Sequence, residues 1–329
     1  MKQRVIDSIL QGMLRDLNNA QLKKLQSVLI CVLGGVEISE IRDTSTHPSH
    51  NGELLGQFLA AKEVEGCSPK SLKYYQSTIK TAFEVIDKDV TVMQTDDVRN
   101  YLTEYQRSRG LSRVTIDNIR RILSSFFNWL EDEDYILKSP VRRIHKIKTT
   151  MGVKETFTDE MLEAIKDSCA EPRDLAMVDM LASTGMRVGE LVLLNRDDLD
   201  FNERECIVFG KGNKERVVYF DAQAKLHVQR YLESRTDANP ALFVTLNAPY
   251  TRLSINGVET RMRKLGDRIG IQKVHPHKFR RTLATMAIDK GMPIEQLQQL
   301  LGHKRIDTTL QYAMVKQSNV KLAHRRYIG

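Results

Sequence analysis

The chain has 329 residues, of which 41% are hydrophobic and 28% are charged, a composition that excludes disorder throughout. Its length is enough for about two domains of roughly 150 residues, each with a core of its own. No apolar run approaches the roughly 20 residues of a membrane span, so no membrane partner is expected. The four cysteines are widely spaced and form no C-x-x-C pair, which argues against a disulfide framework or a zinc site and favours the reducing cytoplasm.

The positive charge is concentrated in the last quarter of the chain. The whole sequence has a net charge of +8, whereas residues 251–329 carry 16 Lys and Arg against five Asp and Glu, a net charge of +11. Residues 151–250 carry 12 basic and 18 acidic residues, a net charge of −6. A concentrated basic region is typical of proteins that bind a polyanion, most often nucleic acid, although a solvated basic surface gives the same pattern.

The first 48 residues form a segment of their own. Apolar residues recur with the helical period along residues 1–30, which predicts a helix with one buried face. The polar stretch 42–52 contains Pro, Gly and several Ser and Thr residues, and it predicts a linker. We therefore expect an N-terminal helical extension over residues 1–48.

Residues 49–140 are expected to form an all-helical domain that binds DNA. Four helical patterns follow one another, and Ser68, Ser112 and the segment 95–97 are placed to cap three of their starts. Several basic residues on these helices and on the connector after them could contact DNA phosphates, or they could be ordinary solvated charges. They are Lys70, Lys73, Arg113, Arg120, Arg121, Arg142 and Arg143.

A basic connector over residues 141–153 leads to a second domain, which we expect over residues 154–329. The domain begins with Thr158 in an N-cap position. The strong strand signal of the chain lies in this domain, where two apolar runs, 206–209 and 216–220, flank a turn that contains glycine. This pattern predicts a β-hairpin. The absence of alternating strand and helix patterns argues against a Rossmann or P-loop enzyme.

Arg187 and Lys211 are candidates for contact with a phosphate in this domain. Arg187 lies at a break between two helical patterns, so the backbone would hold its guanidinium in a defined place, and a guanidinium suits bidentate phosphate contact. An ion pair with Glu190, three residues later, is the alternative explanation. Lys211 lies in the turn of the predicted hairpin, where Lys214 and Arg216 are rival cations.

The basic C-terminal region contains two further groups of candidates. A proline at a predicted first helical position places His277 and Arg280 on one face of the first turn, where free backbone N–H groups favour an anion. His303 follows a helix that ends at a glycine, and Tyr312 lies nine residues later on a short helix that we expect Asp307 to cap. Taken singly, each of these residues has an ordinary structural explanation.

Together these residue types could cleave DNA through a covalent intermediate. A tyrosine hydroxyl can attack a phosphodiester and keep the bond energy in a phosphotyrosyl link, but its pKa of about 10 means that it needs cationic neighbours or a base. Arginines and a histidine can neutralise the charge that develops on the non-bridging oxygens, and a lysine can protonate the departing 5′ oxygen. This chemistry needs no metal and no other cofactor, so we expect none.

Five short motifs occur in the order, and at about the separations, of the tyrosine recombinases, the phage integrase and Xer-type family. They are Thr184-Gly-Met-Arg187-x-x-Glu190, Gly210-Lys211-Gly-Asn-Lys, His277-x-x-Arg280, Leu300-Leu-Gly-His303 and Thr308-Thr-x-x-Tyr312. The chain resembles this family over about residues 53–320. The resemblance implies a mainly α protein with a small β component, in which an all-helical core-binding domain and a mixed α/β catalytic domain form a C-shaped clamp around DNA.

The resemblance also implies a catalytic set and a set of partners. The set is Arg187, Lys211, His277, Arg280, His303 and the nucleophile Tyr312, with Glu190 orienting it. In it the arginines bind the scissile phosphate, the lysine is the general acid, and the histidines contact phosphate and manage protons. The implied partners are a double-stranded DNA recombination site, further copies of the chain in a synaptic homo-tetramer, and accessory DNA-bending or directionality proteins. Such a protein is expected in the cytoplasm, on the nucleoid.

Three features depart from the family pattern or extend it. Arg281 stands at a variable position where many members have a second histidine, and it is a further candidate for contact with DNA. Residues 1–48 are helical and nearly neutral, unlike the small basic arm-binding domains of some integrases, so we expect them to pack or to contact another protomer. The 17 residues after Tyr312 leave room for a short tail helix, which in the family often docks on a neighbouring protomer.

Two other functions are compatible with some of these residues. A type IB topoisomerase cleaves and religates one strand with similar chemistry, although the helical domain before the catalytic one favours a recombinase. A DNA-binding or architectural protein with a vestigial site is the second alternative, and the complete motif set argues against it. The main expectation is a site-specific recombinase that cleaves and rejoins DNA through a 3′-phosphotyrosyl intermediate, for integration, excision or resolution, and that a mobile element could encode.

Overall fold

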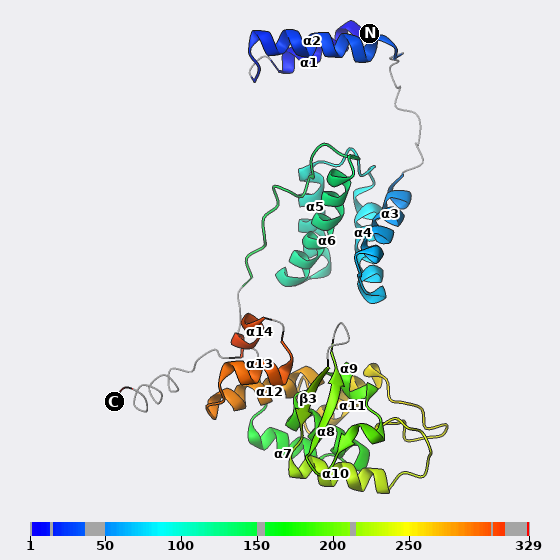
Figure 1. Ribbon diagram of the computed structural model, residues 1–329, viewed down its shortest axis with the longest axis vertical. Coiled ribbons are helices and arrows are strands. Elements are labelled where there is room, and N and C mark those ends of the chain that lie inside the picture. Colours follow the sequence, from blue (N-terminus) through cyan, green and yellow to red (C-terminus); the bar gives the residue numbers. More distant parts are fainter. Residues whose placement is uncertain are drawn as a thin grey trace. The chain divides into compact units, whose positions relative to one another are not determined.

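The computed structural model describes residues 2–13, 16–36, 50–149, 155–210, 215–303 and 305–312, together with residue 328. The chain divides into two compact units, Met1–Thr150 and Met151–Gly329. Its described part is mostly helical and contains one small three-stranded antiparallel sheet (Figure 1), which confirms the predicted fold class. No helix in the described ranges is both long enough and apolar enough to cross a membrane.

The first helical pattern forms two helices, so the prediction of one helix over residues 1–30 is wrong. Helix α1 spans Lys2–Gly12 and α2 spans Asn19–Gly34, and the two pack against each other. The side chain of Asn18 accepts a hydrogen bond from the backbone N–H of Gln21, and the side chain of Gln21 accepts one from the N–H of Asn18, each at 3.0 Å. This reciprocal capping box starts a new helix within the apolar pattern.

Four packed helices follow in the first unit (Figure 1). They are α3 (Asn51–Val64), α4 (Pro69–Ile86), α5 (Thr95–Arg109) and α6 (Arg113–Asp132). Ser68 and Ser112 cap α4 and α6 as predicted, but the N-cap of α5 is Gln94, whose N–H donates to the carboxylate of Asp97. The core of the bundle is aromatic and aliphatic, and its largest fully buried residues are Leu55, Phe58, Ile79, Ile116, Leu123, Phe126, Phe127 and Leu130.

Asp117, on α6, bonds the connector to this bundle. One oxygen of its carboxylate accepts a hydrogen bond from the backbone N–H of Ile147 at 3.0 Å and another from Nε of Arg120 at 2.9 Å. Burying a carboxylate costs free energy unless it is paired, and these two donors supply the pairing. Arg120, one of the predicted DNA contacts, therefore has a structural partner within its own unit.

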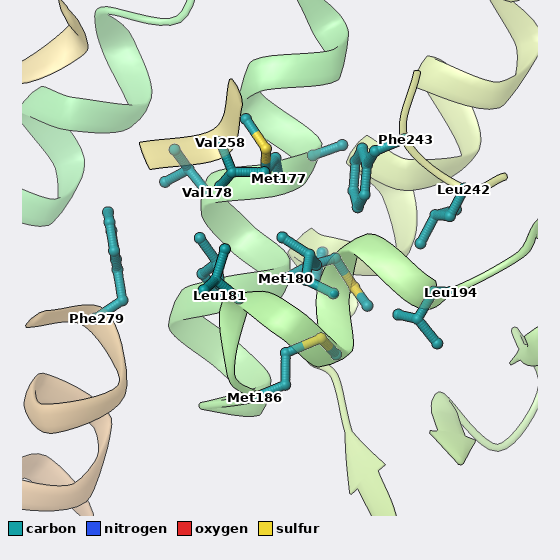
Figure 2. Packing of buried hydrophobic residues seen from close by; sticks show 14 of the residues in the cluster. Met177, Val178, Met180, Leu181, Met186, Leu194, Leu242, Phe243, Val258 and Phe279 are labelled. Atoms are coloured by element: carbon teal, nitrogen blue, oxygen red, sulfur yellow. The ribbon is translucent and has the colours of Figure 1, made fainter. Parts of the chain in front are cut away.

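The second unit contains eight α-helices in its described ranges, arranged around the buried helix α8. They are α7 (Asp159–Asp167), α8 (Pro172–Thr184), α9 (Val188–Leu193), α10 (Ala222–Glu233), α11 (Ile255–Arg268), α12 (Pro276–Asp289), α13 (Ile294–Leu301) and α14 (Ile306–Leu310). Helices α7, α10 and α12 pack against α8. Figure 2 shows Met177, Met180 and Leu181 of α8 among side chains from other elements, including Phe243 and Val258. This core holds the segments that carry the motif residues.

The predicted hairpin is present and forms part of a three-stranded sheet in the order β1-β2-β3. Strand β1 spans Leu199–Asp200, β2 spans Glu205–Phe209 and β3 spans Glu215–Tyr219, and the central register pairs Ile207 with Val217. Each hairpin strand begins one residue before its predicted start. The two-residue strand β1 was not predicted, because so short a segment has no readable period of two.

The helix ends near the motif residues agree with the sequence except at one place. Pro276 is the first residue of α12, and α13 ends at Gly302, whose φ of +63° is the left-handed conformation that favours glycine. The N-cap of α14 is Arg305, so the prediction that Asp307 caps this helix is wrong. Asp307 lies in the first turn, where its carboxylate pairs with the guanidinium of Arg305 at 2.8 Å.

Candidate active site

Arg187 is held at the break between α8 and α9. Gly185 ends α8 with a φ of +61°, a left-handed conformation that favours glycine, and a Cβ there would lie 2.6 Å from the side chain of Leu283 and force it to move. Arg187 follows as the N-cap of α9, and its Nη2 donates to the carbonyl of Gly302 at 3.3 Å. The side chain keeps 35% of its surface exposed, which leaves it accessible to a ligand.

Glu190 is a buried carboxylate that orients Arg187. It accepts a hydrogen bond from the backbone N–H of Arg187 at 2.7 Å and another from Nη1 of the same residue at 2.8 Å. Both of its oxygens also accept from the guanidinium of Arg216. Burial raises the pKa of Glu190, but these hydrogen bonds outweigh it and hold the pKa below its ordinary value, so the group is ionised. The ion pair that the sequence offered as an alternative for Arg187 is thus part of the arrangement.

Arg280 lies at the centre of the candidate site. It is 3% exposed, and its Nη1 donates to the carbonyl of Gly185 at 2.6 Å, while Nη2 donates to the carbonyl of Leu301. The same Nη2 is 3.0 Å from Nε2 of His303. Burial, followed by the charges of neighbouring arginines, lowers the pKa of Arg280 to about 10, so the guanidinium remains charged at neutral pH.

His303 has a defined tautomer in this arrangement. Because an arginine has only donors, Nε2 of His303 accepts from Arg280, and Nδ1 must carry the ring proton. Nδ1 then donates to Oγ1 of the buried Thr309 at 2.8 Å. Burial and the neighbouring guanidiniums, that of Arg280 first, lower the pKa of His303 to about 4, so the ring is neutral at neutral pH.

Tyr312 lies against His303. The two rings are stacked with their centroids 5.9 Å apart and an angle of 25° between their planes. The backbone N–H of Tyr312 donates to the carbonyl of Thr309, so one short segment positions both the partner of His303 and the tyrosine. Tyr312 also packs against the small cluster of Ala284, Leu297 and Leu301, which joins α12 to α13.

Helix α12 adds His277 to the site and also bonds the first described residue of the unit, Glu155. His277 is exposed to solvent, but protein atoms around its ring remove some of its water. This desolvation, followed by the charges of Arg280 and Arg187, lowers the pKa of His277 below its ordinary value, so it too is neutral at neutral pH. Arg281, a predicted DNA contact, donates to the carbonyl of Glu155 at 2.8 Å. The remaining predicted DNA contacts, apart from the paired Arg120, are exposed on the first unit: Lys70, Lys73, Arg113, Arg121, Arg142 and Arg143.

Of the predicted catalytic set, the structure brings together Arg187, Arg280, His303 and Tyr312. Glu190 is bonded to Arg187, and His277 is within electrostatic range of Arg187 and Arg280. Lys211 lies outside the described residues. Within the described part of the chain, no group of three or more His, Cys, Asp or Glu side chains could hold a metal ion. The gathered residues can bind a phosphate through two guanidiniums beside an aromatic hydroxyl.

The structure adds two residues that the sequence did not single out. Arg216 appeared only as a rival to Lys211, and its pairing with Glu190 depends on a contact between residues 26 positions apart. Thr309 is fully buried and bonded to His303, and its only signal was its place in the Thr308-Thr motif. Neither contact leaves a period or a spacing that a single sequence reveals.

Comparisons with known protein families cover both units. The model described as "Phage integrase family" matches residues 153–319, and the model described as "Phage integrase, N-terminal SAM-like domain" matches residues 54–137. The chain is 31% identical over 287 residues to tyrosine recombinase XerC of Leptospira interrogans, a match that covers 83% of this chain and 92% of the relative. It is 30% identical over 289 residues to tyrosine recombinase XerC of Oceanobacillus iheyensis, covering 83% of this chain and 94% of that one.

Solved structures with a similar fold include recombinases bound to DNA. XerH site-specific recombinase, in a post-cleavage complex with a palindromic difH substrate, has a TM-score of 0.67 at 19% identity, covering 97% of this chain and 94% of that chain. A lambda integrase dimer bound to a core site has a TM-score of 0.66 at 18% identity, covering 88% and 85%. At these identities the likeness establishes the fold.

Proposed function

The chain belongs to the phage integrase family and is a site-specific tyrosine recombinase, and from this premise we propose that Tyr312 is the nucleophile that cleaves its DNA. The observation that carries the proposal is the gathering of Arg187, Arg280, His303 and Tyr312 from three separate segments of the second unit. Stability alone does not call for an aromatic hydroxyl beside this concentration of positive charge. A phosphodiester placed against the two guanidiniums explains it.

In the proposed first step, Oη of Tyr312 attacks the phosphorus of the scissile phosphodiester. The tyrosine gives its proton to a neutral histidine, His303 or His277, a bond forms between Oη and phosphorus, and the bond from phosphorus to the 5′ oxygen breaks. The DNA 3′ end is left joined to the enzyme. Arg187 and Arg280 stabilise the negative charge that develops on the non-bridging oxygens, where such interactions typically contribute about 3 to 4 kcal/mol each.

Two neutral histidines are available to move protons. His303 has one lone pair, on Nε2, and that lone pair faces Arg280 in the arrangement described above. A phosphate that draws the guanidinium toward its own oxygens would leave Nε2 free to accept a proton. His277 is neutral and exposed in the first turn of α12, where it can accept or donate a proton on the same phosphate.

We propose Lys211 as the general acid, on the strength of its place in the family motif. It would give a proton to the 5′ oxygen as that oxygen leaves. Strand joining is the reverse: a 5′ hydroxyl attacks the phosphotyrosyl bond, Tyr312 leaves, and the protons return to their donors. Because the covalent link conserves the energy of the phosphodiester, no external energy source enters this balance.

The first unit and the connector are proposed to hold the DNA. Exposed basic residues on α4, α6 and the connector support contact with phosphates, and the recombinases of similar fold described above are bound to DNA recombination sites. We propose the domain roles that the sequence indicates: an extension over 1–48 for packing or protomer contact, a core-binding domain over 49–140, a linker over 141–153 and a catalytic domain over 154–329. With them we propose the C-shaped clamp, a homo-tetramer in the synaptic complex, help from accessory proteins, and action in the cytoplasm on the nucleoid.

A nicked suicide DNA site tests the proposed nucleophile. Such a site loses a short strand after cleavage, so the covalent intermediate accumulates and migrates as a protein–DNA adduct on a denaturing gel. We expect the wild-type chain to form this adduct in the presence of EDTA and Tyr312→Phe to form none, because the variant lacks only the attacking oxygen. DNA binding by the variant, measured by gel shift, should equal that of wild type.

Tyr250→Phe is a matched control, because Tyr250 is a tyrosine of the same unit whose backbone bonds Asn239 and Asn247, outside the site. It should form the adduct at the wild-type rate. An adduct that persists in Tyr312→Phe would refute the assignment of the nucleophile. A requirement for magnesium would refute the proposed chemistry.

A further inference from the structure

We propose that Arg216 is a positioning residue for DNA cleavage, which holds Glu190 by both carboxylate oxygens and so leaves the guanidinium of Arg187 directed at the phosphate. This inference rests on the proposed function, because it concerns how the same site is prepared. Arg216 lies on β3, whereas the residues it serves lie on α9 and after α13. It thus joins the sheet to the two segments that carry Arg187 and His303.

All three nitrogens of the Arg216 guanidinium are occupied within the protein. Nη1 and Nη2 donate to the two oxygens of Glu190, each at 2.7 Å, and Nε donates to the carbonyl of Leu300 at 3.0 Å. The side chain is 11% exposed, compared with 35% for that of Arg187. Arg216 is therefore placed to support other residues and is not free to bind the substrate.

The sharing of Glu190 between two arginines is unequal, and the inequality matters for the reaction. The guanidinium of Arg216 binds both oxygens in a bidentate pair, whereas the guanidinium of Arg187 donates to the carboxylate through Nη1 alone, and its Nη2 has a long contact of 3.3 Å to the carbonyl of Gly302. If Arg216 were absent, the buried carboxylate would be free to take both nitrogens of Arg187. The guanidinium of Arg187 would then turn inward, away from a phosphate.

The charge of the site supports the same interpretation. The guanidiniums of Arg187 and Arg216 pair with the carboxylate of Glu190, and that of Arg280 is within electrostatic range of it. Because His303 is neutral, the three arginines and the one carboxylate have a net charge of +2. A phosphodiester under attack develops a second negative charge on its oxygens. The positive charge of Arg216 offsets the negative charge of Glu190, so the charges of Arg187 and Arg280 remain available to the phosphate.

Arg216 also packs against the turn that precedes His303. A Cβ on Gly302 would lie 2.9 to 3.2 Å from three atoms of the Arg216 side chain, and Nε of Arg216 bonds the carbonyl two residues before Gly302. The place of this turn fixes the backbone of His303, whose ring contacts Arg280 and Tyr312. Loss of the guanidinium would therefore loosen the site on two sides.

The test is the single-turnover rate of adduct formation on the suicide site at saturating DNA, for Arg216→Lys and for a matched control, Arg173→Lys. Arg173 is also a buried arginine that donates twice to a carboxylate, that of Asp174, and once to a backbone carbonyl, that of Val244, but it lies outside the site. Lysine keeps the charge in both variants and cannot make the bidentate pair.

We expect Arg216→Lys to lower this rate constant by about 10- to 100-fold, since a small misplacement of a catalytic group has effects of this size. The DNA dissociation constant should stay within about twofold of wild type. Arg173→Lys should lose thermal stability and keep the wild-type rate constant. A rate constant is the right readout, because partial unfolding lowers the amount of adduct and not the rate at which folded molecules form it.

Two further variants keep the inference testable if Arg216→Lys folds poorly. Gly302→Ala and Gly270→Ala place a Cβ at similar φ values of +63° and +69°, but only at Gly302 does the Cβ meet the Arg216 side chain, while nothing lies within 4 Å at Gly270. Gly302→Ala should slow adduct formation, and Gly270→Ala should leave it unchanged.

A double substitution tests whether Arg216 acts through Glu190. If it does, the Glu190→Gln/Arg216→Gln variant should be about as slow as the slower single variant, and the two losses should not multiply. Multiplied losses would overturn the inference, as would equal rate constants for Arg216→Lys and Arg173→Lys in a protein whose Tyr312 forms the adduct. An absence of adduct from the wild-type chain would instead overturn the proposed function and, with it, this inference.

Discussion

Among the described residues of the second unit, two buried carboxylates are each held by two guanidiniums, and the two clusters differ in what they leave open. Asp174 is paired with Arg173 and Arg261, whose side chains are 7% and 19% exposed. Glu190 is paired with Arg216 and with Arg187, which is 35% exposed. The first cluster is closed, because Arg173 donates to protein groups through all three of its guanidinium nitrogens and Arg261 is mostly buried. The second is open on the side of Arg187.

The open cluster also has neighbours that the closed one lacks. Arg280 adds a third guanidinium, and His303 and Tyr312 add an imidazole and a phenol. Asp174 adjoins Cys169, whose thiol pKa is raised to about 12 by burial, so that thiol is not a nucleophile. Buried charge by itself therefore does not identify a functional site. An accessible guanidinium with a reactive group beside it is the distinguishing feature.

Removing an arginine from the open cluster should give the largest effect on catalysis. We expect Arg187→Ala and Arg280→Ala to lower the rate of adduct formation by about 10²- to 10³-fold, because each removes a donor to the developing charge on phosphate. DNA affinity should fall by much less, since we expect many other basic residues to contact the DNA backbone. The measurement is single-turnover cleavage of the suicide site together with a gel shift. A total loss of DNA binding would assign these arginines to docking.

Breaking the closed cluster should affect folding and not catalysis. Arg261→Ala leaves Asp174 with one partner, and removing one member of a buried ion pair typically costs about 3 to 5 kcal/mol. Because Arg261 is partly exposed, we expect the lower end of that range for the free energy of unfolding, measured by urea denaturation. The rate constant of adduct formation should match wild type. A slowed reaction in the folded variant would show that the two clusters are coupled.

The neutral His303 makes the stability of the open cluster depend on pH. The pKa of His303 is about 4 in the folded protein, and an unfolded histidine titrates near about 6.5. Between these values the unfolded chain binds more protons, so the contribution of His303 destabilises the fold as the pH falls from about 6.5 toward 4. We expect the urea midpoint of His303→Gln to fall less than that of wild type between pH 7 and pH 5. An identical fall of the urea midpoint in both proteins would contradict the lowered pKa of His303 in the folded protein.

Two adjacent arginines on α6 show the same contrast between a charge that is paired within the protein and one that is exposed. Arg120 is paired with the buried Asp117, whereas Arg121 is exposed. We expect Arg121→Ala to weaken DNA binding a few fold and to reduce the slope of log affinity against log salt by about 1, as loss of one phosphate contact does. Arg120→Ala should lower the melting temperature of the protein and leave that slope unchanged. Equal slopes for both variants and wild type would remove Arg121 from the DNA interface.

Local sequence was enough to predict most helix starts. The predictions were wrong where a second local feature, such as an unbroken apolar period or a neighbouring charged residue, gave a different signal. Ser68, Ser112 and Thr158 cap helices as predicted, because an N-cap needs only the N–H groups of the next turn. The break at Asn18 was missed, because the apolar period continues across it and hides the capping box. Asp307 looked like a cap but pairs with Arg305 from within the first turn.

The sequence alone determined the fold class, the family and the identity of the motif residues, because apolar periods, caps and short ordered motifs are written in neighbouring positions. Only the tertiary structure decided how the charges are shared. The bidentate hold of Arg216 on Glu190, the tautomer of His303 and the burial of Arg280 each depend on contacts between segments far apart in the chain. Such contacts form when the core around α8 packs, and it is this packing that leaves one guanidinium open while it closes the others.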